Sequence, residues 1–107
     1  MNEQAKELSA KNRYDVDDLC AIVRVLRGEG GCPWDRAQTH ASIRSCAIEE
    51  AYEVAEAIDK NDSVLLCEEL GDLLFQAVFH AQLEAERGGF TIGDVVDGNA
   101  RKMIDRH

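Results

Sequence analysis

Apolar residues in this chain recur at every third or fourth position, which is the spacing of one face of an α-helix. No segment shows the alternation that is typical of a half-buried strand, and the segments between the periodic runs contain glycine, asparagine and aspartate. The pattern therefore predicts an all-α protein with four helices, at about residues 15–27, 41–60, 64–87 and from 91 to the chain end. Thr39 and Thr91 are expected to cap the second and fourth helices, and residues 61–63 to form the turn before the third.

The second and third helices carry acidic residues inside their apolar faces. Glu50 shares a face with Ile43, Ala47, Val54, Ala57 and Ile58. Glu69 and Asp72 share a face with Leu65, Gln76, Phe79 and Leu83. A second apolar face follows Leu66, Leu70, Leu73, Ala77 and His80. The third helix is thus apolar on two sides, which predicts that it is central in the fold or buried in a dimer.

Residues 49–72 hold nine carboxylates against one lysine, so that this helical hairpin contains nearly all of the net charge of −9. The short turn predicts antiparallel packing, which places Glu50 and Glu53 opposite Glu69 and Asp72. Four oxygen donors without nitrogen or sulfur suit a hard cation, Mg²⁺ or Mn²⁺. A solvated acidic face would explain Glu56, Asp59, Asp62 and Glu68, but it does not explain acidic residues at core positions.

Two other metal chemistries fit the sequence less well. A di-iron site needs Glu-x-x-His on two helices, whereas the residues three after Glu50 and Glu69 are Glu53 and Asp72. His80 is predicted to be a hydrogen-bonded core histidine rather than a ligand. A zinc site built from the cysteines and histidines has little support, because the four cysteines form no C-x-x-C pair. We expect all four to be free thiols, three of them on helices.

Length and composition limit the remaining possibilities. At 107 residues the chain has the size of one domain, with a polar extension at residues 1–14 and the domain at 15–107. An isoelectric point of about 4.7 argues against nucleic-acid binding and against anionic membranes. No apolar run reaches the length of a membrane span, and the N-terminus lacks an apolar signal core. The expected location is cytoplasmic.

Basic and aromatic residues outside the hairpin are candidates for substrate binding. Lys102 and Arg106 lie four residues apart on the last helix, where they either meet phosphates or form a solvated helix end. Residues 28–40 form a loop that is expected to be a lid or substrate wall. In it Trp34 either stacks on a base or, as we favour, plugs the end of the bundle, and Arg36 is a weaker phosphate candidate.

The acidic pattern resembles the metal motif of the MazG-like nucleotide pyrophosphohydrolases. The residues that carry it are Glu50-Ala51-Tyr52-Glu53 and Glu69-Leu70-Gly71-Asp72, supported by the stretches 31–40, 49–59, 68–82 and 102–107. The resemblance implies a four-helix-bundle fold completed by dimerisation or higher homo-oligomerisation. It implies Mg²⁺-dependent hydrolysis of nucleoside triphosphates to the monophosphate and pyrophosphate. It also adds Glu49 to the acidic site and matches Lys102 and Arg106 to phosphate-binding residues.

In this mechanism water attacks the α-phosphorus, and Glu49 or Glu53 takes the proton. The catalytic set is Glu49, Glu50, Glu53, Glu69 and Asp72. The chain departs from the family pattern at Cys46, at Asp105 and in ending at His107, where members usually continue. The alternative function is therefore a catalytically weak, metal-binding or regulatory dimerisation domain of a longer MazG protein.

Overall fold

The computed structural model describes residues 3–107, and every regular element among these residues is a helix. The helices are α1 (Glu3–Ser9), α2 (Val16–Arg27), α3 (Pro33–Arg36), α4 (His40–Asp59), α5 (Ser63–Glu86) and α6 (Ile92–Arg106). The all-α prediction is confirmed, and α2, α4, α5 and α6 each begin and end within a residue or so of the predicted bounds. The short helices α1 and α3 were not predicted. Helix α1 lies within the predicted extension, whose first two residues fall outside the described part of the chain.

Side-chain caps fix where the long helices begin. The Thr39 hydroxyl accepts from the backbone N–H of Ser42, and the Thr91 hydroxyl accepts from that of Asp94, each in a reciprocal capping box. The Asp62 carboxylate accepts from the N–H of Leu65 at the start of α5. Asn61 has a φ of 55°, a left-handed conformation that asparagine tolerates and that reverses the chain between α4 and α5. The predicted caps are thus confirmed.

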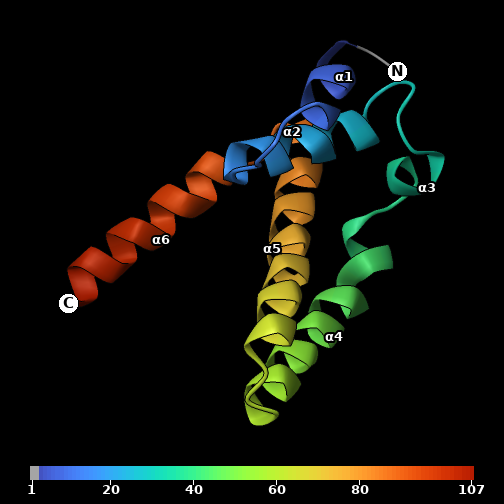
Figure 1. The fold of residues 1–107 in the computed structure, drawn as a ribbon. Coiled ribbons are helices and arrows are strands. Elements are labelled where there is room, and N and C mark those ends of the chain that lie inside the picture. The colour runs from blue at the N-terminus through green and yellow to red at the C-terminus, as the bar shows by residue number, and fades with distance from the viewer. Residues whose placement is uncertain (1–2) are drawn as a thin grey trace.

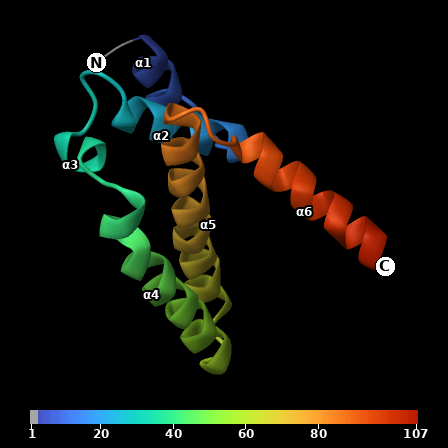
Figure 2. The ribbon, with the colours of Figure 1, turned by 180° about the vertical axis from the view of Figure 1, so that it is seen from behind.

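The antiparallel pair α4 and α5 forms the long axis of the molecule, and α2 crosses the far end of α5 (Figures 1 and 2). Helix α5 packs against α2, α4 and α6, so its predicted central position is confirmed. The core lies where α2, α4 and the second half of α5 meet, and it contains Cys20, Val23, Ile43, Val78, Phe79 and Leu83. The acidic half of the hairpin lies beyond this core, toward the turn.

Helix α6 leaves the far end of α5 and points away from α4 (Figures 1 and 2). None of its residues is buried, and Val96 and Ile104 are largely exposed. Apolar side chains are also exposed on the hairpin, at Tyr52 and Leu70 among others. Within one chain, therefore, α6 does not close a bundle with α4 and α5. The predicted completion of the bundle by a second copy stays a prediction.

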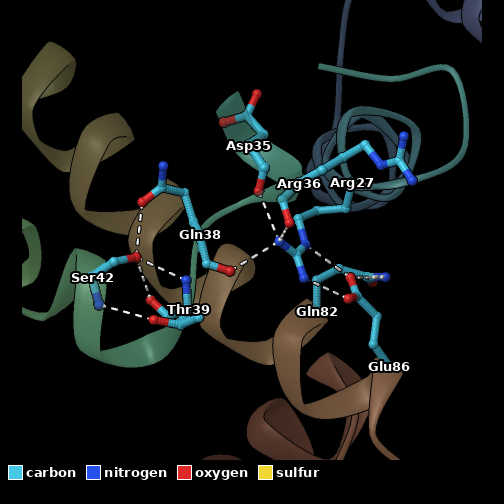
Figure 3. A network of polar contacts seen from close by, with 8 residues as sticks. All are labelled: Arg27, Asp35, Arg36, Gln38, Thr39, Ser42, Gln82 and Glu86. Atoms are coloured by element: carbon cyan, nitrogen blue, oxygen red, sulfur yellow. Dashed lines mark hydrogen bonds and ion pairs between the residues drawn. The ribbon is translucent and has the colours of Figure 1, made fainter. Parts of the chain in front are cut away.

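Arg27, at the end of α2, holds α3 in place (Figure 3). Its Nη1 donates to the backbone carbonyls of Asp35, Arg36 and Gln38, at 2.8, 2.9 and 3.0 Å. Its Nε and Nη2 donate to the two carboxylate oxygens of Glu86 on α5, at 3.0 and 2.6 Å. The guanidinium also lies 5.8 Å from the ring centroid of Phe79. One side chain thereby ties α2, α3 and α5 together.

Some predicted side-chain positions are wrong. Trp34 is 67% exposed on α3, so it does not plug the end of the bundle. Ile58, assigned to the apolar face of α4, is exposed because the hairpin core ends at Ala57 near the turn. The cysteine prediction is confirmed: all four are free, and Cys20, Cys46 and Cys67 lie on helices. In residues 3–107 no helix has both the length and the apolar character needed to cross a bilayer.

Candidate metal centre

Four carboxylates from α4 and α5 meet on the inner side of the hairpin. Glu50 and Glu53 come from α4, Glu69 and Asp72 from α5, and one oxygen of each lies within 4.8 Å of the others. The spacing of three residues on each helix aligns both pairs on one face. Glu50 and Asp72 lie at equal distances along the chain from Asn61, as do Glu53 and Glu69, so the antiparallel hairpin places them opposite one another. The predicted grouping of these four residues is thus present in the structure.

Crowding and partial burial change the proton affinity of this cluster. Burial is the main cause that raises the pKa of Glu50, and the charges of Glu53 and Asp72 add to it. A hydrogen bond with Glu53 is the main cause that raises the pKa of Glu69 to about 7, and burial adds to it. Both shifts arise because several negative charges share a small, half-buried space. A cation there would relieve the repulsion.

The donor atoms fit a hard divalent cation. Glu50 Oε2 and Glu69 Oε2 are buried and have no hydrogen-bond partner among the described residues. An unsatisfied buried carboxylate oxygen is costly, and ligation to a cation would satisfy it. The cluster offers only oxygen ligands, which is the set that Mg²⁺ and Mn²⁺ prefer. The residues present therefore fit the group that the sequence predicts.

The remaining predicted site residues lie on three different helices. Glu49 is exposed beside Glu50 on α4, and its charge contributes to the raised pKa of Glu50. Trp34 and Arg36 lie on α3, before the first residue of α4, and both are exposed. Lys102 and Arg106 lie exposed on α6, the helix that points away from α4. One chain does not bring these four substrate candidates together with the carboxylates.

Two polar features of the hairpin were not foreseen: the surroundings of Gln76, whose face the sequence did predict, and the partners of His80. Gln76 lies one turn beyond Asp72 on α5, and its buried Oε1 has no hydrogen-bond partner among the described residues. Farther along the hairpin, His40 contacts His80 and Glu84. The prediction that His80 is hydrogen-bonded is confirmed, although its partner was not foreseen. Helical periodicity places each of these residues on a face, but it does not identify a partner on another helix.

A helical hairpin with two Glu-x-x-Glu/Asp pairs facing inward defines an all-α protein with a carboxylate cluster whose oxygens suit a hard cation. The family model described as the MazG nucleotide pyrophosphohydrolase domain matches residues 38–107, a span that contains α4, α5 and α6. The chain belongs to the MazG family.

Several relatives have related sequences. The nucleoside triphosphate pyrophosphohydrolase/pyrophosphatase MazG of Thermotoga maritima is 50% identical over 91 residues, covering 85% of this chain and 36% of that protein. The nucleoside triphosphate pyrophosphohydrolase of Escherichia coli K12 is 46% identical over 93 residues, covering 86% of this chain and 35% of that protein. The Bacillus subtilis protein YabN is 52% identical over 94 residues, covering 88% of this chain and 19% of that protein. The chain thus spans between a fifth and about a third of these relatives.

Proposed function

We propose that this domain hydrolyses nucleoside triphosphates to the nucleoside monophosphate and pyrophosphate with Mg²⁺ as its cofactor. The observation that carries the proposal is the four-carboxylate cluster, with two buried oxygens that have no other partner in the described chain. Membership of the MazG family and relatives named as pyrophosphohydrolases support the reaction class. Mn²⁺ would suit the same oxygen ligands.

Glu50, Glu53, Glu69 and Asp72 would hold the cation on the inner side of the hairpin. Once bound, it supplies charge neutralisation of the triphosphate and activation of water near neutral pH. The cluster alone repels a triphosphate, so the substrate would bind only after the carboxylates are neutralised. An anionic substrate would therefore bind at this site only together with a divalent cation or after one has bound.

The chemical step is an in-line displacement at the α-phosphorus. The water oxygen forms a bond to phosphorus, the bond from phosphorus to the bridging oxygen breaks, and pyrophosphate leaves with that oxygen. The proton of the water passes to a carboxylate that is not fully used as a ligand. Glu49, exposed beside Glu50, and Glu53, at the open side of the cluster, are the candidates for this role.

We further propose that the active form is a homodimer in the cytoplasm. The basic residues Lys102 and Arg106 lie on a helix that points away from its own α4, while apolar side chains on α6 and on the hairpin are exposed. A second copy whose α6 packs along this hairpin would cover those side chains and bring basic residues to the phosphates. Four free thiols suit a reducing compartment.

The proposal is tested by measuring pyrophosphate release from a panel of ribo- and deoxyribonucleoside triphosphates with Mg²⁺. Release that is lost in Glu50→Gln would support it. Reaction in ¹⁸O-labelled water locates the attack, since the label enters the monophosphate if water attacks the α-phosphorus. If no triphosphate releases pyrophosphate, the alternative function is favoured: a metal-binding or regulatory dimerisation domain of a longer MazG protein.

A further inference from the structure

A histidine pair joins the start of α4 to α5, away from the carboxylate cluster. Nδ1 of His40, the first residue of α4, lies 2.7 Å from Nδ1 of His80. His40 Nε2 lies 2.6 Å from Glu84 Oε2, the oxygen that also accepts from Arg87. The side chain of Glu84 is only 12% exposed and that of His40 36% exposed. The proposed reaction uses none of these four residues.

The geometry determines where the protons lie. The hydrogen bond from His40 is the main cause that holds the pKa of Glu84 below its ordinary value, so this carboxylate is ionised near neutral pH. His40 Nε2 must then carry the hydrogen that it donates, which leaves Nδ1 of a neutral His40 as an acceptor. His80 consequently donates from its own Nδ1. Only one hydrogen fits between two ring nitrogens 2.7 Å apart.

We infer that His40, His80 and Glu84 form an acid-sensitive latch, which holds the first turn of α4 against α5 while at least one ring is neutral and opens when both rings are protonated. A first added proton is tolerated, because a charged His40 can donate from Nδ1 to a neutral His80. A second proton would place two N–H groups against each other and two positive charges in contact. Glu84 can compensate only the ring that it contacts.

The direction of the pH dependence follows from His80. Burial, and secondly the neighbouring His40, lower the pKa of His80 below its ordinary value of 6.5. A histidine whose pKa is lowered in the folded state stabilises the latch at pH values above the pKa that the histidine has in the unfolded chain. The contribution is lost as the pH falls from 6.5 through the lower folded value. The latch is therefore closed near neutral pH and opens in mild acid.

The charged groups around the histidine pair should limit the opening to the start of α4. On α5 the pair faces Glu84, which also accepts from Arg87 just after the end of that helix, and Arg44 is exposed one turn along α4. Arg27 of α2 donates its hydrogen bonds to Glu86 and to the backbone carbonyls of residues 35, 36 and 38. Asp35 and Arg36 are the charged residues of α3 on this side. Arginine does not titrate, and the hydrogen bond from Arg27 holds the pKa of Glu86 below its ordinary value. Arg27 should therefore keep α3 fixed while the start of α4 is released.

The test is amide hydrogen exchange of the whole chain between about pH 5 and about pH 8, corrected for the intrinsic exchange rate. The probes are the amides of Ser42 and Ile43, which are hydrogen-bonded to Thr39. As the pH falls below 6.5, the ordinary pKa of His80, we expect the protection of these amides to fall by up to about tenfold per pH unit, as linkage to one proton requires. His80→Phe keeps an aromatic ring but cannot be protonated, so it should abolish this fall in protection. The matched control His107→Gln, at the far end of α6, should leave the fall unchanged.

Protection that does not vary over this pH range, or an equal fall in His80→Phe, would overturn the latch. A second measurement needs no variant: ¹⁵N chemical shifts of the imidazoles at neutral pH should show Nε2–H on His40 and Nδ1–H on His80. Nδ1–H on a neutral His40 would contradict the proton assignment. Neither measurement depends on nucleotide hydrolysis, so the latch and the proposed function fail separately.

Discussion

Among single residues, those at the inner side of the hairpin are the most affected by their surroundings. Glu50 and Glu69 each bury a carboxylate oxygen that no described residue satisfies, and both titrate above the ordinary range. Asp72 is more exposed, yet it adds its charge to both. The cluster is therefore under electrostatic repulsion in the absence of a cation, and ligation should stabilise the fold.

Asp72→Asn tests this at a position where the isosteric change removes the charge but little volume. In the parent, Mg²⁺ or Mn²⁺ should raise the midpoint of thermal unfolding, by an amount equivalent to about 2.7 kcal/mol at a hundredfold excess over Kd. The variant should fold and show no such rise, and Asp97→Asn, exposed on α6, serves as the matched control. A rise equal to that of the parent would remove Asp72 from the ligand set.

The raised pKa of Glu69 predicts opposite effects of pH on the apo and the metal-bound protein. A carboxyl whose pKa is raised to about 7 in the folded state stabilises the apo protein below its unfolded pKa of 4.5, and this contribution is lost as the pH rises through 7. The stabilisation by Mg²⁺ should increase over the same interval, because the ligands must be deprotonated. Thermal unfolding of the parent and of Glu69→Gln, with and without Mg²⁺, measures both effects. Identical pH profiles in the two proteins would contradict the assignment.

At the scale of helices, Arg27 is the residue on which the placement of α3 depends. Arg27→Ala would leave three carbonyls and the Glu86 carboxylate without this donor. We expect a loss of about 2–4 kcal/mol in the free energy of unfolding, as for removal of one partner of a largely buried charged network. Urea unfolding measures it, with exposed Arg24→Ala on the same helix as the control. A loss no larger than in Arg24→Ala would show that α3 is held by other contacts.

The sequence predicted the elements better than the contacts between them. Helices α2, α4, α5 and α6 and their caps follow from periodicity and from polar residues at helix starts, which are local signals. The carboxylate cluster was predictable because a short turn makes α4 and α5 antiparallel. The pairing of Arg27 with Glu86 and of His40 with His80 was not, because each joins distant parts of the chain and no spacing encodes it. Helix α3, whose carbonyls at Asp35 and Arg36 accept from Arg27, was missed for the same reason.

At the scale of the whole molecule, the direction of α6 limits how the proposed phosphate contacts can form. Lys102→Ala should leave stabilisation by Mg²⁺ intact and weaken nucleotide use, by about 2–3 kcal/mol if the contact is desolvated. Arg106→Ala should act likewise, but more weakly near the helix end. The measurement is kcat/KM beside the metal-induced shift in the unfolding midpoint. Unchanged turnover in Lys102→Ala would make α6 a solvated basic end and direct attention to Arg36.

A mixture of two impaired variants tests whether the site is shared between copies. If Lys102 of one copy serves the carboxylates of the other, a heterodimer of Glu50→Gln with Lys102→Ala contains one intact site. Mixing should then raise pyrophosphate release above that of either variant alone. No increase after verified subunit exchange would place Lys102 with its own cluster, and sedimentation as a monomer at micromolar concentration would exclude the dimer.

Because the carboxylates are equally spaced on either side of Asn61, their convergence depends on the exact number of residues between each of them and the turn. One alanine inserted into α4 after Glu56 would turn Glu50 and Glu53 by about 100° relative to α5, since a helix has 3.6 residues per turn. The helix would survive such an insertion, but the four oxygens would no longer converge, so cation-induced stabilisation should vanish from a protein with an unchanged helical circular dichroism spectrum. Between residues 50 and 72, then, this chain should tolerate many changes of residue but almost none of length.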